Sequence, residues 1–533
     1  VLRDSEVVDR AGPAIVLHDG ATTIVEPGWV ATRSSSGAML MRRVGAAPAM
    51  VFDAGDPGHV EILNRRFLSI CRDMGTALQH TASSVNIKER LDYSCALFDP
   101  DGRMVAQAAH IPVHLGSMGE SVRYVRQARL GTMQAGDVYM LKDPYHGGTH
   151  LPDVTVITPV FGEHGTVQEP DILFFVASRG HQADIGGTTP GSMPPDSRTL
   201  DDEGVLIDNF LLVEAGMFRE PALHELLGGG TYPARNPDQN VADIKAQIAA
   251  NEKGVQELRA MVAHFGLHVV HAYMQHVQDN AEASVRRLLD RLHSGRFEYT
   301  MDDGNAVCVK IDIDREKQEA MIDFTGTSQQ ADNNFNAPAA VCRAAVIYVL
   351  RSLVDEDIPL NDGCLKPVRL IVPVGSMLNP RPPGAVVAGN VETSQCITDC
   401  LYGALGVMAA AQGTMNNFTF GNNAGYQNYE TICGGAGATA VRDGCDAVHT
   451  HMTNSRLTDP EVLEWRFPVL LEEFSIRRGS GGAGKFIVGS SAFTAQGVND
   501  EFLARLAGEI PTEKIIIAVD CLENQVAVKG WKK

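Results

Sequence analysis

Four side chains that can bind a metal or move a proton lie together in one glycine- and proline-rich stretch, residues 143–153. They are Asp143, His146, His150 and Asp153. Imidazole and carboxylate groups together suit a divalent metal such as Mn, Zn or Fe. A spacing of three can place His150 and Asp153 on one side of a turn. A His-x-x-Asp pattern in a loop is nevertheless a weak signal by itself, and a structural role for these side chains stays open.

A second polar cluster follows at residues 178–187, after an apolar run that predicts a strand over 172–177. It contains His181 and Asp184 among several glycines. Binding and catalytic residues are found disproportionately on loops at the ends of regular elements, and this loop is too rich in glycine to pack a core. The segment is therefore a second candidate for a functional site.

Two further segments carry charged or imidazole side chains, but a structural role explains them more simply than a functional site does. Residues 86–94 hold a dense charge run with Glu89, a pattern typical of a solvated loop. Residues 110–118 hold His110 and His114, but Pro112 argues against one helix presenting both, and a single His is more often structural. Four polar clusters between residues 86 and 187 are harder to explain together as packing, so we expect a site among them.

The loop 479–486 imitates a phosphate-binding loop but lacks two features of one. Its letters, GSGGAGKF, fit both GxxxxGK and GxGxxG. A phosphate loop continues with Ser or Thr, which holds Mg²⁺, and with a helix whose N-terminus faces the phosphates. Here Phe486 follows, and residues 486–488 predict a strand. We therefore expect no nucleotide at this loop, and the sequence also lacks the GxSxG pattern of serine hydrolases.

The elements that would position these clusters mix helices and strands without a regular βαβ rhythm, which favours the α+β class. Periodicity and β-branched runs predict strands over 13–17, 22–25, 94–99, 103–107, 138–142, 154–161, 172–177, 307–313 and 320–324. Helical spacing predicts helices over about 56–78, over 241–292 with a break near Gly266, and over 339–354 and 398–411. Residues 45–49 read as a linker.

Composition narrows the class of protein. Lys and Arg total 45 and Asp and Glu total 65, so the net charge is −20, which disfavours nucleic acid and anionic membrane surfaces as partners. No apolar run approaches the roughly 20 residues of a membrane helix. The ten cysteines include no CxxC pair. Scattered buried thiols in a reducing compartment, the cytosol, are the simpler interpretation.

Long stretches of the chain resemble the hydantoinase B/oxoprolinase family, from about Asp56 to Lys485. The segments that carry the resemblance include NIKERLDYSCALFDPDG (86–102), THLPDVTVITPVF (149–161), SRGHQADIGGTTPGSMPP (178–195), DFTGTSQQADNNFNAP (323–338) and HMTNSRLTDPEVLE (451–464). The segments SRGHQADIGGTTPGSMPP (178–195) and DIPLNDGCLKPV (357–368) are especially similar to single-chain 5-oxoprolinases. Residues 1–46 resemble the end of the hydantoinase A half, which precedes the B half in those fused enzymes.

The resemblance implies a domain plan and an activity. We expect a β-rich tail of a hydantoinase A-like region over 1–46, a mixed multi-layer hydantoinase B-like domain with long helices over 51–486, and a divergent segment over 487–533. The implied reaction is ATP-dependent opening of 5-oxo-L-proline to L-glutamate, part of glutathione metabolism. Phosphorylation of the carbonyl oxygen by the ATP-binding half would let water attack the carbon in the B half.

The resemblance also implies site residues and partners. Related carboxylases hold a Mn-type metal, and by similarity its ligands are expected at Glu89, His150, Asp153 and His181. Asp184 is expected to orient His181 or to act as a general base, His114 and His146 are further acid/base candidates, and Arg179 is a candidate clamp for the substrate carboxylate. The implied partners are 5-oxoproline, a hydantoinase A-like half that uses ATP and Mg²⁺, and further copies of the chain.

Three alternatives remain open. The chain resembles N-methylhydantoinases and acetone-carboxylase-like subunits of the same family as well. A different class is an inactive fragment or an assembly subunit, because the chain begins at Val1 without an initiator Met and carries only the tail of an ATP-binding half. Residues 487–533 do not resemble the family pattern, which is expected of a truncated or mis-spliced product.

Overall fold

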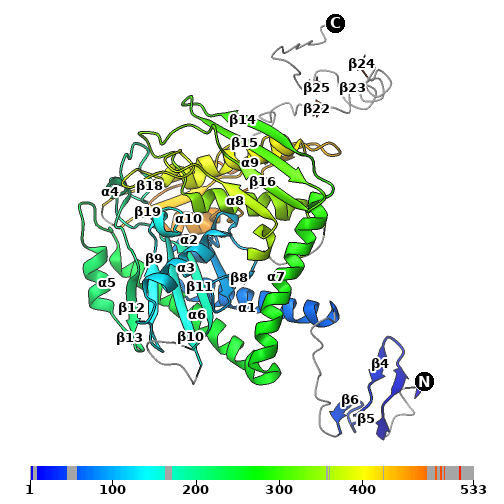
Figure 1. The fold of residues 1–533 in the computed structure, drawn as a ribbon. Helices are drawn as coiled ribbons and strands as arrows, with labels where there is room; N and C mark the ends of the chain where they lie inside the picture. The colour runs from blue at the N-terminus through cyan, green and yellow to red at the C-terminus, as the bar shows by residue number, and fades with distance from the viewer. Residues whose placement is uncertain are drawn as a thin grey trace. The chain divides into compact units, whose positions relative to one another are not determined.

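The computed structural model describes residues 2–3, 9–44, 57–162, 171–355, 358, 360–423, 425–476 and four short strands beyond residue 485. The chain forms two compact units, Val1–His59 and Val60–Lys533, each described by itself (Figure 1). The linker expected at 45–49 and the glycine-rich loop at 479–485 lie outside the described residues, as does most of 487–533. The late strands are β22 (Phe486–Val488), β23 (Phe493–Thr494), β24 (Gly497–Val498) and β25 (Ile515–Ile517).

The first unit consists of short strands separated by turns. They are β1 (Leu2–Arg3), β2 (Asp9–Ala11), β3 (Ala14–Leu17), β4 (Thr22–Val25), β5 (Trp29–Arg33) and β6 (Met39–Arg43). One sheet has the order β1-β3-β4 and the other has the order β2-β5-β6. The buried core is small and contains Val16, Val25 and Ala31. The strands expected over 13–17 and 22–25 correspond to β3 and β4.

A seven-stranded sheet is the centre of the second unit. Its strands are β7 (Tyr93–Phe98), β8 (Met104–Gln107), β9 (Val138–Leu141), β10 (Asp153–Phe161), β11 (Ile172–His181), β12 (Phe210–Glu214) and β13 (Met217–Phe218). The order is β13-β12-β9-β10-β11-β7-β8, and every neighbouring pair is antiparallel. Successive residues of β9 are all buried, as are most residues of β10 and β11, so the middle of this sheet is covered on both faces.

Helices cover the two faces of this sheet. Two of them, α6 (Pro237–Phe265) and α3 (Ser117–Ala128), pack against the central strands β10 and β11. The other described helices are α1 (Pro57–Thr81), α2 (Val85–Lys88), α4 (Leu200–Glu203), α5 (Glu220–Leu227), α7 (Leu267–Leu289), α8 (Ala339–Leu353), α9 (Ser394–Leu405) and α10 (Pro460–Arg466). Val156 of β10 belongs to a core cluster with Ile244 of α6, whereas Ile157 belongs to one with Met118 of α3. Adjacent residues of one strand thus enter different cores, as the alternation of side chains requires.

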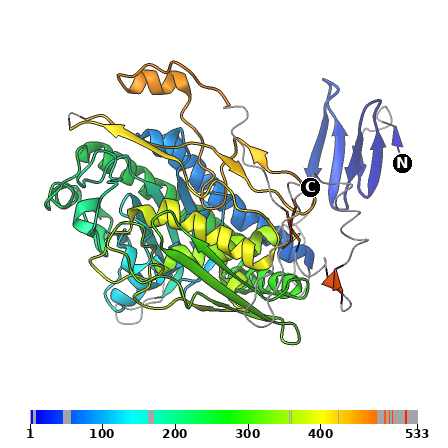
Figure 2. The same ribbon diagram turned by 90° about the horizontal axis from the view of Figure 1, so that it is seen from above.

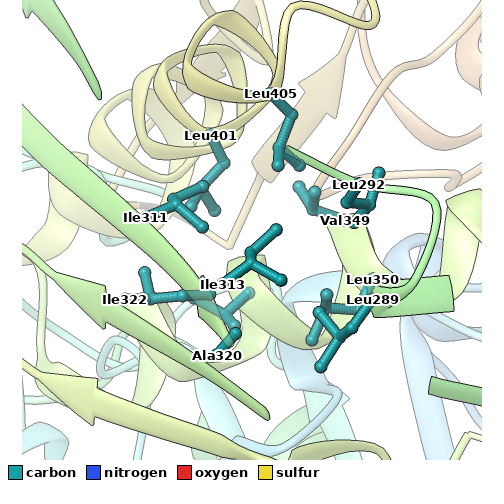
Figure 3. A pocket seen from close by; sticks show the side chains of 11 residues that line it. Leu289, Leu292, Ile311, Ile313, Ala320, Ile322, Val349, Leu350, Leu401 and Leu405 are labelled. Atoms are coloured by element: carbon teal, nitrogen blue, oxygen red, sulfur yellow. The ribbon is translucent and has the colours of Figure 1, made fainter. Parts of the chain in front are cut away.

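A second sheet of four strands lies against α9. It has the order β14 (Gly295–Thr300), β15 (Ala306–Asp314), β16 (Glu319–Asp323), β17 (Val368–Ile371), and α9 packs on β14 and β15 (Figure 2). A cavity of about 10 Å³ remains where this sheet meets α7, α8 and α9. Only aliphatic side chains such as Leu289, Ile313 and Leu405 line it (Figure 3). A gap of this size and chemistry is a packing defect with no group that could bind substrate.

The remaining elements are short and lie mostly toward the C-terminal side of the described chain. They comprise β18 (Asn417–Gly421), β19 (Gln427–Thr431), β20 (Gly435–Ala436), β21 (Cys445–Asp446), a π-helical turn at Gly389–Thr393 and 3-10 turns at Pro112–His114, Pro144–His146 and Asp362–Leu365. β18 and β19 form an antiparallel hairpin.

Two expected boundaries were wrong. The strand expected to end at Ala177 continues to His181, because Gly180 pairs with Tyr93 of β7 and with Val154 of β10. The helix expected over 398–411 is α9, Ser394–Leu405, and ends at Gly406, whose φ of 65° is left-handed. The hairpin at 94–107 and the helix break at Gly266 agree with the sequence interpretation.

Two further observations concern membranes and thiols. Among the described residues, no helix combines the length and apolar character that a membrane crossing requires. The nine cysteines that the structure describes are all free thiols, and six of them are buried. The mixed α+β class expected from the sequence is confirmed.

Candidate metal centre

The register of two strands brings the site together. β10 begins at Asp153, which pairs with His181, the last residue of β11. Directly opposed residues of an antiparallel pair project to the same face with neighbouring Cβ atoms. The backbone N–H of Asp153 donates to the carbonyl of His150 at 3.1 Å. This turn places the side chain of His150 beside the other two.

The three side chains converge through their ligand atoms. His150 Nε2 lies 3.3 Å from His181 Nδ1 and 3.4 Å from Asp153 Oδ2, and His181 Nδ1 lies 3.3 Å from Asp153 Oδ1. Donor atoms about 2.1 Å from an ion in a tetrahedral arrangement lie roughly 3.4 Å apart. Two imidazole nitrogens that face each other cannot both carry a proton without a clash. The spacing and the chemistry of this donor set therefore fit a divalent cation.

Burial and charge favour the metal-binding forms of Asp153 and His181. The exposed fractions of His150, Asp153 and His181 are 0, 1 and 2%. Burial opposes ionisation of Asp153, but the nearby His150 and His114 outweigh burial and hold the pKa of its carboxyl well below the usual range. Burial lowers the pKa of the His181 imidazole, against the opposing effects of Asp92 and Asp153. A carboxylate and a neutral imidazole are the ligand forms.

Several buried groups surround the three. His114 Nε2 lies 3.2 Å from Asp153 Oδ2, and its Nδ1 lies 2.9 Å from the Ser94 hydroxyl. Thr149 donates its hydroxyl to the same Asp153 oxygen. The Asn390 amide nitrogen lies 3.5 Å from His150 Nε2. Such contacts orient a ligand and tune its basicity, so His114 lies where it could influence Asp153 directly.

Glu89 does not lie with the other expected ligands. It follows α2 as the C-terminal cap residue, and its Oε1 lies 3.9 Å from Arg466 Nη2. Asp92, three residues later, approaches the cluster instead, with Oδ2 4.0 Å from His181 Nδ1. The solvated loop expected at 86–94 was also wrong, because Asp92 is only 7% exposed and Arg90 is fully buried. The strand expected over 94–99 was the available signal, because in the structure it begins at Tyr93 and holds Asp92 against the buried sheet.

Asp184 holds a loop together instead of contacting His181. Its Oδ1 accepts hydrogen bonds from the backbone N–H groups of Gly186 and Arg235, each at 3.0 Å. Its Oδ2 accepts from the N–H of Gly191 at 3.0 Å and from Arg235 Nη1 at 2.9 Å. Both oxygens are thus committed, and the carboxylate has a structural explanation.

Arg179 is likewise saturated by the protein. Its Nε donates to the Thr155 hydroxyl at 2.7 Å, Nη1 to the Ser117 hydroxyl at 2.6 Å and Nη2 to the Ser121 hydroxyl at 2.9 Å. The residue is fully buried, and burial lowers the pKa of its guanidinium to about 10. This geometry ties α3 to the sheet and leaves little of the guanidinium for a substrate carboxylate.

His146 belongs to a different group of side chains. Its Nδ1 lies 2.7 Å from Asp143 Oδ2 and 3.8 Å from Asp208 Oδ1, and its ring stacks on Tyr124 with centroids 4.2 Å apart. The side chain of His146 is 40% exposed. Among the described residues, two clusters have ligand atoms that all lie within 4.8 Å of one another. One consists of Asp143, His146 and Asp208, and the other, the His150 group, consists of His150, Asp153 and His181. The buried His150 group is the better candidate for a metal.

Comparison with known proteins places the chain in a family. The family model described as hydantoinase B/oxoprolinase matches residues 56–505. A 5-oxoprolinase from Dictyostelium discoideum is 45% identical over 89% of this chain and 38% of its own length. A 5-oxoprolinase from Saccharomyces cerevisiae is 44% identical over 90% of this chain and 39% of its own length.

A solved structure agrees with the sequence relatives. The ATP-dependent caprolactamase of Pseudomonas jessenii superimposes with a TM-score of 0.71 at 26% identity, covering 81% of this chain and 77% of that one. The chain spans about two fifths of the length of the curated 5-oxoprolinases that it matches. The family model nevertheless covers most of it. The chain belongs to the hydantoinase B/oxoprolinase family.

Proposed function

We propose that this chain is the hydrolytic half of an ATP-dependent 5-oxoprolinase, which opens 5-oxo-L-proline to L-glutamate when coupled to an ATP-binding half. The observation that carries the proposal is the 44–45% identity to curated 5-oxoprolinases over about nine tenths of the chain. The similarity to an ATP-dependent caprolactamase supports the same reaction class, because caprolactam is also a cyclic amide.

The chemistry requires activation before hydrolysis. An amide carbonyl is a poor electrophile and its nitrogen is a poor leaving group. A hydantoinase A-like half would transfer a phosphoryl group from ATP, with Mg²⁺, to the carbonyl oxygen. Water would then attack the activated carbon in the site described above, the ring C–N bond would break as the nitrogen takes up a proton, and hydrolysis would release phosphate and glutamate. This division of labour is consistent with relatives that are more than twice as long as the matched region.

His150, Asp153 and His181 would hold a divalent metal, with Asp92, whose Oδ2 lies 4.0 Å from His181 Nδ1, as a candidate for a fourth ligand. When bound, such an ion supplies a Lewis acid and lowers the pKa of a coordinated water toward 7. His114 would steady Asp153, because its Nε2 lies 3.2 Å from Asp153 Oδ2 and its Nδ1 is held by the Ser94 hydroxyl. Burial of the whole group would strengthen each of these electrostatic effects.

The proposal extends to the surroundings of the enzyme. The partner would be the hydantoinase A-like half, and the compartment would be the cytosol, where free thiols such as those of this chain persist. We also propose that residues 1–46 are the tail of a hydantoinase A-like region, that 51–486 form the hydantoinase B-like domain and that 487–533 are a divergent segment.

A coupled assay tests the proposed function. The chain is mixed with a separately produced hydantoinase A-like half, and glutamate is measured with 5-oxo-L-proline as substrate, with and without ATP. Parallel reactions contain hydantoin, N-methylhydantoin or caprolactam. We expect glutamate only when ATP and both halves are present. Faster turnover of a hydantoin or of caprolactam than of 5-oxoproline would refute the substrate assignment.

A further inference from the structure

The imidazole of His181 is stacked on a tyrosine that comes from a distant part of the chain. The ring of Tyr429, in β19, lies 4.3 Å from the His181 ring between centroids, at an interplanar angle of 16°. Among the described residues, His181 Nε2 has no hydrogen-bond partner. The torsion that turns an imidazole about its Cβ–Cγ bond has a broad energy well, so neighbouring contacts must set the ring plane. Tyr429 stacks on a face of the His181 ring, whereas the His150 ring meets the His181 ring edge to face, with centroids 5.1 Å apart.

A buried arginine holds this tyrosine. The Arg90 guanidinium carbon lies 4.8 Å from the centre of the Tyr429 ring, and Nη1 donates to the Tyr429 carbonyl at 2.6 Å. Nη2 donates to the hydroxyls of Thr431 at 3.0 Å and Ser455 at 3.2 Å. Arg90 is fully buried and Tyr429 is only 2% exposed. The planar fork of arginine suits this combination of stacking and several directed hydrogen bonds.

The same arginine also reaches the acidic side of the site. Arg90 Nη2 lies 3.7 Å from Asp92 Oδ2, the oxygen that lies 4.0 Å from His181 Nδ1. One cation therefore contacts the tyrosine behind the histidine and the carboxylate beside it. A fully buried charge with these partners is costly to maintain unless each contact is satisfied.

We propose that Tyr429 is a positioning residue that fixes the ring plane of His181, and that Arg90 fixes Tyr429 and Asp92 in turn. The inference rests on the proposed function, in which His181 is a metal ligand. A nitrogen lone pair is directional, so rotation of the ring moves it away from the point where the His150, Asp153 and His181 donors converge. Loss of a contact that orients a ligand typically weakens metal binding about 10–100-fold.

Cobalt(II) binding tests the proposal without any enzyme activity. The full chain and its variants are titrated with Co²⁺ alone, and the visible absorption bands report both the dissociation constant and the ligand geometry. We expect Tyr429→Leu to raise the dissociation constant about 10–100-fold and to change the band shape. Tyr429→Phe keeps the aromatic ring, so its dissociation constant and band shape should match those of the unchanged chain. Tyr426→Leu, an exposed tyrosine of the adjoining turn, is the matched control.

Milder changes keep the test independent of folding. Should Tyr429→Leu fail to fold, Tyr429→Met replaces it, because methionine is unbranched and adapts to an irregular buried space. Ser455→Ala removes one hydrogen bond from Arg90 and should shift the dissociation constant in the same direction by a smaller factor.

Two outcomes would overturn the proposal and are distinguishable. If Tyr429→Leu and the unchanged chain bind Co²⁺ with equal affinity and identical bands, while His181→Ala loses the ion, the positioning role is refuted and the ligand set stands. If His181→Ala binds Co²⁺ as the unchanged chain does, the ligand set itself fails and the inference fails with it.

Discussion

Replacement of Asp184 by asparagine should destabilise the fold and leave the metal site intact. The carboxylate is 2% exposed and receives four hydrogen bonds, two on each oxygen. Asparagine has the same shape but carries only one acceptor oxygen. Whichever way the amide turns, its NH₂ group faces two donors and both of those bonds are lost.

The size of the effect follows from these contacts. Hydrogen bonds to a charged group contribute about 1.5–3 kcal/mol each, so the loss of two predicts a decrease of roughly 3 kcal/mol or more in the free energy of unfolding. Breaking one partner of a buried ion pair independently suggests about 3–5 kcal/mol. The pair in question is Asp184 Oδ2 with Arg235 Nη1, and the Arg235 side chain is only 14% exposed.

The assay is equilibrium urea denaturation followed by circular dichroism, with the metal content of the folded variant measured in parallel. Asp196→Asn, a change of the same kind at an exposed position, is the control and should alter the free energy by less than about 0.5 kcal/mol. If Asp184→Asn kept full stability and lost metal or hydrolytic activity, the structural explanation would be wrong. Asp184 would then be the general base or the orienting group that the sequence suggested.

Three other changes test separate parts of the account. Burial raises the pKa of the Glu203 carboxyl to about 8, so the folded chain keeps a proton that the unfolded chain releases near pH 4.5. Stability should therefore fall as the pH rises from about 5 toward 8, by at most about 1.4 kcal/mol per pH unit, and Glu203→Gln should flatten this slope in urea titrations; an unchanged slope would contradict the assignment. Arg179→Lys should lower the free energy of unfolding by about 3 kcal/mol, because one ammonium nitrogen cannot reproduce the guanidinium fork. A selective rise in KM for 5-oxoproline at unchanged stability would instead support a substrate clamp. His146→Ala should keep both the fold and the metal, since the ring is 40% exposed and lies in the other cluster; loss of the ion in elemental analysis would show that the clusters are coupled.

Residue type and spacing drew attention to His150, Asp153 and His181, and the family resemblance implied that they form one ligand set together with Glu89. A spacing of three can place His150 and Asp153 on one side of a turn, but this pattern is a weak signal by itself. His181 stood out as an imidazole next to glycines. The structure adds the reason that they meet, which is the pairing of Asp153 with His181 across two strands. Register between strands depends on tertiary packing and is not readable from one strand alone.

Other parts of the site depended on contacts between distant segments. Arg90 and Tyr429 are separated by 339 positions, and nothing in either local pattern indicates that they touch. Glu89 and Asp92 are both carboxylates in one charge run, and only the end of α2 and the start of β7 decide which of them approaches His181. Asp184 was a plausible base by type and position, but two of its four hydrogen bonds come from Arg235, far along the chain.

The long elements were predictable for a physical reason. The hairpin of β7 and β8 and the helices α6 and α7 have strong periodicity and clear turn residues. The strand was expected to end at Ala177, before Gly180, because glycine within a strand pattern usually indicates a break. The position of Gly180 between two neighbouring strands stabilises the extended backbone in spite of its conformational freedom.

Metal content is the most direct test of the central claim that His150, Asp153 and His181 form a metal centre. The purified chain and its His150→Ala variant are analysed by plasma mass spectrometry after dialysis, with His146→Ala as the control. We expect about one Mn, Zn or Fe per chain, lost in His150→Ala and retained in His146→Ala. A well-folded chain without metal, or one whose metal content is unchanged in His150→Ala, would contradict it.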